Sequence, residues 1–129
     1  MKVLALDFGR ARTGVAVSDP SGTIARPLEI VERAGSEAGL ARLAELIREE
    51  EAERVVVGLP LTLRGERGEQ ARETEAFVEQ LRAVISVPVE SYDERFTTRL
   101  AQTAPGPDDA RAAAHLLSSY LEWSSAAKE

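Results

Sequence analysis

The sequence predicts an α/β fold, a mixed five-stranded sheet flanked by helices. Two observations predict it. Short apolar runs follow one another closely in the first thirty or so residues, which is typical of an antiparallel hairpin and a third strand. Helical periodicity then alternates with continuous apolar runs, which is typical of parallel strands joined by helices.

The first strands are expected at Val3–Leu6, Thr13–Val17 and Ile24–Ile30. The segment Phe8–Arg12 is short enough to join the first two strands as a hairpin. The turn-forming run Asp19–Gly22 precedes the third strand. Together these segments predict the antiparallel part of the sheet.

A helix is expected from Ser36, which is a suitable N-cap, because one apolar face follows it at Leu40, Leu43, Leu46 and Ile47. The next strand is Val55–Val57, a continuous apolar run typical of a strand buried on both faces. A second helix follows the loop Leu63–Gly68, with an apolar seam at Ala71, Thr74, Val78, Leu81 and Ile85.

The last strand is expected at Val87–Tyr92. The final helix begins after Pro105–Pro107, because proline ends whatever precedes it. Its inner face carries Ala113, Leu116, Leu117, Tyr120 and Leu121. In sheets of this kind, functional sites collect at the carboxyl ends of the parallel strands.

The composition limits the chemistry that the chain can perform. The 129 residues match one domain spanning 1–129, and they contain no cysteine and only His115 as histidine. Thiol catalysis, redox pairs, cysteine zinc sites and histidine-rich metal clusters are therefore excluded. Carboxylates remain as the candidate catalytic groups, with Ser, Thr, Lys and Arg in support.

The charge balance is acidic, with 22 acidic against 16 basic side chains and a net charge of -6. The net charge is not typical of a nucleic-acid binder, so nucleic-acid binding would depend on a local cluster of basic side chains. No signal peptide is evident and no apolar stretch approaches the ~20 residues that span a bilayer. We therefore expect a cytoplasmic protein without a membrane partner.

Asp7 ends the apolar strand that should be central in the sheet. A charge there is costly unless it is paired or well hydrogen-bonded, and its place at the strand end lets it face a groove that a phosphate or metal could enter. The alternative is a turn aspartate that accepts hydrogen bonds from the backbone of Gly9 or Arg10.

Asp109 is spaced to project from the buried stripe of the final helix, toward the strand ends where Asp7 lies. Capping of that helix by Asp109 or Asp108 is the alternative. Asp93 and Glu94 follow the last strand, and by alternation only one of them readily faces Asp7. An ion pair between Glu94 and Arg95 is the alternative there.

Convergent carboxylates repel one another and raise each other's pKa, so a compensating charge is needed. A hard divalent cation supplies it, because carboxylate oxygens and water are the ligands of Mg²⁺ or Mn²⁺. Two such ions clamp the attacking and leaving oxygens in phosphodiester hydrolysis. The sequence therefore favours a carboxylate site for Mg²⁺ or Mn²⁺.

Taken together, several motifs closely resemble the YqgF/RuvX family, in order and over nearly the whole chain. They are Leu6–Gly9, Arg12–Asp19, Val57–Leu61, Asp93–Thr98, and Asp109 with Ala112, Ala113, Tyr120 and Leu121. The resemblance implies an RNase H-like fold related to the RuvC Holliday junction resolvase. It further implies a nuclease that processes the 5′ end of the 16S ribosomal RNA precursor, with branched or single-stranded DNA as other substrates.

Carried over by position, the resemblance places catalytic roles on Asp7, Asp93, Glu94 and Asp109. Two metal ions would be held by Asp7, Glu94 and Asp109. Among the expected substrate-binding residues, Gly9, Arg95, Thr97 and Thr98 match the family's motifs. Positive charge near the proposed groove adds Arg10, Arg12, Arg64 and Arg67, and a solvated surface is the alternative for the arginines. The expected partner is nucleic acid, bound by a monomer or a homodimer.

Two other functions stay open from the sequence. A catalytically silent adaptor could use the same fold to bind RNA or a protein of the ribosome or transcription machinery, which the net charge of -6 favours. A phosphate- or ATP-binding domain is the second, because Asp7–Gly9 leading into a hairpin also resembles the phosphate loop of actin-like and sugar-kinase ATPases.

Overall fold

A computed structural model gives the structure of the chain and describes residues 1–60, 68–93 and 110–127. Its strands are β1 (Val3–Asp7), β2 (Arg12–Ser18), β3 (Ala25–Glu32), β4 (Arg54–Leu59) and β5 (Val89–Asp93). Its helices are α1 (Glu37–Glu49), α2 (Glu69–Arg82) and α4 (Arg111–Ala127). No helix within these ranges is long and apolar enough to cross a membrane.

The strands form one mixed sheet in the order β3-β2-β1-β4-β5. The antiparallel pairs are β1 with β2 and β2 with β3, and the parallel pairs are β1 with β4 and β4 with β5. The predicted mixed five-stranded sheet is confirmed. Because β1 lies in the middle, the residue at its carboxyl end has a neighbouring strand on each side.

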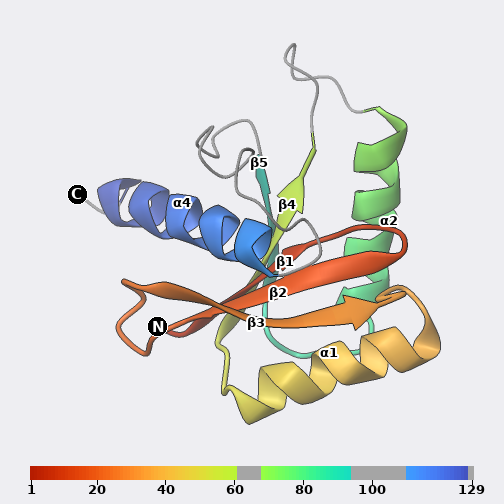
Figure 1. Cartoon of the computed structure of the whole chain (residues 1–129), viewed down its shortest axis with the longest axis horizontal. Coiled ribbons are helices and arrows are strands. Elements are labelled where there is room, and N and C mark those ends of the chain that lie inside the picture. The colour runs from red at the N-terminus through yellow and green to blue at the C-terminus, as the bar shows by residue number, and fades with distance from the viewer. Residues whose placement is uncertain (61–67, 94–109, 128–129) are drawn as a thin grey trace.

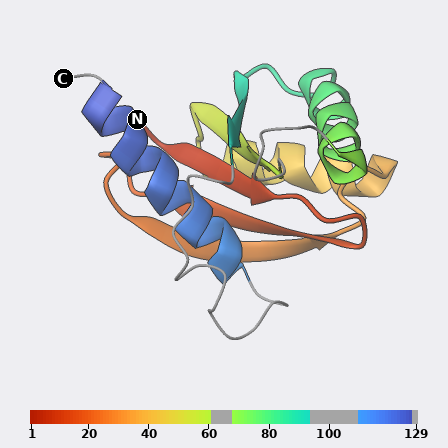
Figure 2. The same ribbon diagram turned by 90° about the horizontal axis from the view of Figure 1, so that it is seen from above.

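The helices cover the two faces of the sheet unequally, as Figures 1 and 2 show, with α1 and α2 on one face and α4 crossing the other. Under α1 and α2 the core contains Leu4, Leu6, Val55, Val57, Leu43 and Phe77, among others. Under α4 it contains Val3, Ala5, Val56, Tyr92, Leu117 and Tyr120, among others. Alternate residues of β1 and β4 thus enter opposite cores, as the two-residue period of a strand requires.

Local signals set most element ends. The Ser36 hydroxyl accepts a hydrogen bond from the Gly39 N–H at 3.0 Å, which confirms the predicted N-cap of α1. β5 begins at Val89, two residues later than expected, because Pro88 has no N–H to donate to a ladder, although its carbonyl still accepts from Val55 at 2.9 Å. α2 ends at Arg82, so Ile85 packs from the following loop and not from the helix.

Candidate active site at the end of the central strand

Asp7 is the last residue of β1 and is half-buried. Its antiparallel partner on β2 is Gly14. On the other side, β1 and β4 run in parallel register up to Leu6 opposite Val57, so Gly58 lies level with Asp7. On each neighbouring strand the residue beside Asp7 is therefore a glycine, so no side chain from β2 or β4 lies next to the carboxylate there.

Asp7 shares a sheet face with Val3 and Ala5, which pack under α4. The C-terminal part of α4 lies at the opposite end of β1, because Leu121 and Ser124 border the same pocket as Met1 and Val3. The N-terminal end of α4 is therefore directed toward the carboxyl end of β1, as Figures 1 and 2 show. Ala110, just before the helix, is buried.

Asp93 occupies the other face. Its β4 partner is Leu59, and Tyr92 before it lies under α4 while Val89 packs with α1 and α2. Two strand spacings separate β5 from β1, so the backbones at Asp93 and Asp7 are about 10 Å apart. The half-buried Asp93 and Asp7 thus leave the sheet in opposite directions.

Several residues expected in the site lie outside the described part of the chain. They are Glu94, Asp109, Arg64, Arg67, Arg95, Thr97 and Thr98. Within residues 1–60, 68–93 and 110–127, no group of three His, Cys, Asp or Glu residues is placed to hold a metal ion. The described part of the site therefore consists of Asp7 and the loop that follows it.

Gly9 is required by the backbone of that loop. A Cβ on Gly9 would lie 2.4 Å from the Arg12 carbonyl oxygen, closer than side-chain carbons approach backbone atoms. The buried Thr13 hydroxyl lies 3.4 Å from both the Gly9 N–H and the Gly9 carbonyl oxygen. The tight turn places the exposed side chains of Arg10 and Arg12 directly after Asp7.

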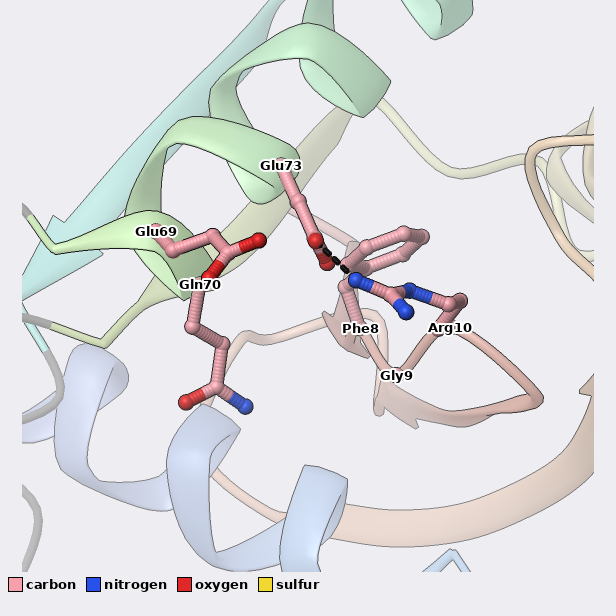
Figure 3. Close-up of a pocket in the computed structure, with 6 residues that line it drawn as sticks. All are labelled: Phe8, Gly9, Arg10, Glu69, Gln70 and Glu73. Carbon is pink, nitrogen blue, oxygen red and sulfur yellow. Dashed lines mark hydrogen bonds and ion pairs between the residues drawn. The ribbon is translucent and has the colours of Figure 1, made fainter.

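Arg10 forms an ion pair with Glu73 of α2 (Figure 3). The Arg10 side chain is 79% exposed and that of Glu73 is 32% exposed. The hydrogen bond that the Arg10 guanidinium donates to Glu73, followed by the negative charge of Glu73, raises the pKa of Arg10 above its ordinary value. No sequence pattern predicts this contact, because the partners are 63 positions apart and no local periodicity links them.

A pocket of about 430 Å³ adjoins this ion pair, between the β1–β2 loop and the start of α2. It is lined by Phe8, Gly9, Arg10, Glu69, Gln70 and Glu73. The Phe8 ring stacks on the buried Phe77, with ring centroids 4.4 Å apart and 18° between the planes. Sequence reasoning missed this pocket, since its two sides come from distant segments.

The sheet order and the placement of the helices define an RNase H-like fold. A structure of Thermus thermophilus RuvC in complex with a Holliday junction substrate matches with a TM-score of 0.72 and 19% identity, over 98% of this chain and 96% of that chain. The fowlpox virus resolvase in complex with Holliday junction DNA matches with a TM-score of 0.57 and 12% identity, over 95% and 98% of the two chains. At these identities the likeness concerns the fold.

The chain belongs to the RuvX family, described as Holliday junction resolvase, whose model matches residues 1–123. A relative from Chloroflexus aurantiacus is 46% identical over 100 residues, which are 78% of this chain and 65% of that protein. A relative from an Anaeromyxobacter species is 43% identical over 133 residues, covering 95% and 97% of the two chains. Both relatives are named "Putative pre-16S rRNA nuclease", and the resemblance noted from the motifs is confirmed.

Proposed function

We propose that the chain is a divalent-metal-dependent nuclease that hydrolyses phosphodiester bonds in nucleic acid. The substrate we infer is the 5′ region of the 16S ribosomal RNA precursor, in the cytoplasm, with branched or single-stranded DNA as the other candidates. The observation that carries the proposal is the placement of Asp7, a half-buried carboxylate at the end of the central strand between two glycine positions.

The ligand set of the proposal is Asp7, Glu94 and Asp109. Alternation along β5 supports Glu94 over Asp93, because Tyr92 lies under α4 on the Asp7 side and Asp93 lies on the other. The direction of α4 supports Asp109, since the helix begins shortly after it and its N-terminal end is turned toward the strand end. Within the pair Asp93 and Glu94, the proposal therefore assigns the inward role to Glu94.

The donor chemistry fits Mg²⁺ or Mn²⁺. Carboxylate oxygens are the ligands that these hard ions prefer, and a chain without cysteine and with one histidine offers no competing zinc site. Gly14 and Gly58 place no side chains beside the Asp7 carboxylate. When bound, the ions would neutralise the carboxylates, activate water and stabilise charge on the phosphate oxygens.

The remaining residues of the proposal bind and orient the substrate strand. Arg10 lies in the tight loop after Asp7 and Arg12 is the first residue of β2, where their exposed guanidinium groups can hold phosphate oxygens while water attacks the phosphorus. Gly9 allows the turn that brings them there. Further contacts are proposed for Arg64, Arg67, Arg95, Thr97 and Thr98. Because the net charge is -6, these local cations must outweigh general repulsion of the nucleic acid.

Cleavage of end-labelled RNA spanning the 16S precursor 5′ region, and of junction DNA, in Mg²⁺ or Mn²⁺ tests the proposal. We expect Asp7→Asn and Glu94→Gln to abolish cleavage, Asp93→Asn to reduce it far less, and Glu122→Gln, an exposed carboxylate on α4, to leave it unchanged. An Asp7→Asn variant as active as the unmodified chain would refute the assignment.

Thermal unfolding separates the nuclease from its rivals. Millimolar Mn²⁺ should raise the melting temperature of the unmodified chain but not of Asp7→Asn, because a ligand of the folded state stabilises it. A silent adaptor would show no such shift. Heat released on titration with ATP, in place of a Mn²⁺ shift, would favour the phosphate-binding alternative.

A further inference from the structure

The pocket beside Arg10 lies at the same strand end as Asp7 but on the other face of the sheet. Phe8 follows Asp7, and alternation turns its side chain toward the core of α1 and α2, where it packs. Neighbouring Cα atoms are about 3.8 Å apart. A strand of nucleic acid lying across this end of β1 can therefore present a phosphate to Asp7 and a base to the pocket.

The lining combines one flat apolar wall with a polar rim. Phe8 is held in place by its stacking on Phe77 at 4.4 Å. Figure 3 shows Glu69, Gln70 and Glu73 extending from the first turns of α2, with the Glu73 carboxylate meeting Arg10 near the Phe8 ring. The exposed Gln70 amide has no side-chain hydrogen-bond partner among the residues that the structure describes.

These groups select against a phosphate inside the pocket, although the 79% exposed Arg10 side chain can still reach a phosphate outside it. Two carboxylates face the pocket against the single guanidinium of Arg10, which is already paired with Glu73. A bare cation would leave the Gln70 donors and the Phe8 ring unused. An unpaired nucleobase uses all of them, because it has a π face for stacking and an edge that carries donors and acceptors.

We propose that this pocket binds one unpaired base of the substrate strand, and that it prefers bases with an exocyclic amino group. Adenine and cytosine carry such a donor for the carboxylates of Glu69 and Glu73 and for the Gln70 carbonyl oxygen, whereas uracil carries none. The proposal rests on the nuclease function proposed above, for which it supplies a base-specific contact next to the reacting phosphate.

Binding of fluorescent single-stranded RNA without divalent ions tests the pocket, with Asp7→Asn as the background so that cleavage plays no part. We expect oligo(A) and oligo(C) to bind about three- to tenfold more tightly than oligo(U) of equal length, the value of one hydrogen bond. Gln70→Ala should reduce this preference. Gln80→Ala, which changes another exposed glutamine of the same helix outside the pocket, should preserve it.

An abasic ribose-phosphate chain tests the stacking wall. Phe8→Leu keeps an apolar side chain but removes the ring, so the advantage of oligo(A) over the abasic chain should fall by about fivefold or more. Thermal unfolding verifies that this variant folds, and Gln70→Ala carries the test if it does not. Equal base preferences in the Gln70→Ala and Gln80→Ala proteins would refute the proposal that the pocket binds a base.

The two proposals can fail separately. If the unmodified chain cleaves RNA in Mn²⁺ but Gln70→Ala leaves base preference unchanged, the pocket is refuted and the nuclease stands. If Gln70→Ala removes the preference but no nucleic acid is cleaved, the nuclease is refuted and the pocket remains as part of a binding module.

Discussion

Asp7 and Gly14 face each other across the β1–β2 ladder, on the side of the sheet that α4 covers. A methyl group at position 14 would stand beside the carboxylate, in space that we assign to bound ions and water. Gly14→Ala should therefore lower Mn²⁺-dependent cleavage by about tenfold or more, since metal sites tolerate small displacements poorly. Gly58→Ala tests the same idea from β4.

Ala16→Gly is the matched control for this prediction. Ala16 is the partner of Ala5, on the same face of the sheet as Asp7 and Gly14 but two residues further from the strand end. Removing the Ala16 methyl group should therefore cost about 0.5–1 kcal/mol of stability and leave cleavage unchanged. If both Gly14→Ala and Gly58→Ala kept full activity and the full Mn²⁺-induced rise in melting temperature, bound ions and water would not occupy the space beside Asp7.

Gly9 should resist substitution on structural grounds. In Gly9→Ala the new Cβ would meet the Arg12 carbonyl oxygen at 2.4 Å, so the loop must shift, at a cost of about 1–3 kcal/mol. Gly68→Ala is the control, because a Cβ added at position 68 would have nothing within 4 Å. Urea unfolding measures both variants, and equal midpoints would show that the loop adjusts freely.

Arg10 should contribute to binding through phosphate contacts. With single-stranded RNA, each phosphate contact adds about 0.7 to the slope of log K against log salt. Arg10→Gln should lower that slope by about this amount, while Arg26→Gln, on β3 beside α1, should not change it. A slope unchanged in Arg10→Gln would mean that Glu73 retains the guanidinium in the complex.

Tyr120 joins two charged side chains at the far end of the sheet. Its hydroxyl donates to Glu90 at 2.9 Å and accepts from Arg54 at 3.0 Å. Burial raises the pKa of Tyr120 above its ordinary value of 10.0, against the effect of Arg54. Tyr120→Phe should cost about 1–2 kcal/mol near pH 8, since both hydrogen bonds are lost.

The raised pKa of Tyr120 also predicts a pH dependence. Above about pH 10 the unfolded chain releases the phenol proton before the folded chain does, so stability falls as pH rises. Tyr120→Phe lacks this part of the loss, and urea unfolding between pH 8 and 11 should show the two proteins converging. If stability fell equally with pH in the unmodified and Tyr120→Phe proteins, the pKa of Tyr120 would not be raised by folding.

Asp19 should make the stability of the fold depend on pH in the acid range. The Ile24 N–H at 2.9 Å, the Ser21 hydroxyl and the Thr23 N–H at 2.8 Å all donate to its carboxylate and hold its pKa well below the ordinary value of 3.8. The stability it adds is present above about pH 4 and is lost as pH falls toward the folded-state pKa. Asp19→Asn should therefore be less stable at pH 7 but lose less on acidification, as unfolding midpoints at pH 7 and pH 3 would show.

Local patterns were sufficient for most of the fold. The Val55–Val57 run predicted a fully buried strand, and Ser36 predicted the start of α1, because burial on both faces and an N-cap each leave a mark within a few residues. The end of α2 was misjudged, since Ile85 continues the apolar spacing although the chain has already left the helix.

The site could be predicted only in part. The alternation of side chains along a strand predicts that Asp93 and Glu94 point to opposite faces of the sheet. Which of these faces carries Asp7 depends on the face that α4 covers, which is a property of the whole fold. The pairing of Arg10 with Glu73 and of Phe8 with Phe77 joins segments far apart in sequence, so no periodicity could reveal it.

Among the described residues, the sheet separates the buried apolar side chains into two clusters, one under α1 and α2 and one under α4. Packing changes in one cluster should therefore combine with those in the other as simple sums of free energy, as distant substitutions do. Stabilising substitutions in the cluster beneath α1 and α2 can thus raise the free energy of unfolding. That gain would offset the stability lost through substitutions around Asp7 on the opposite face.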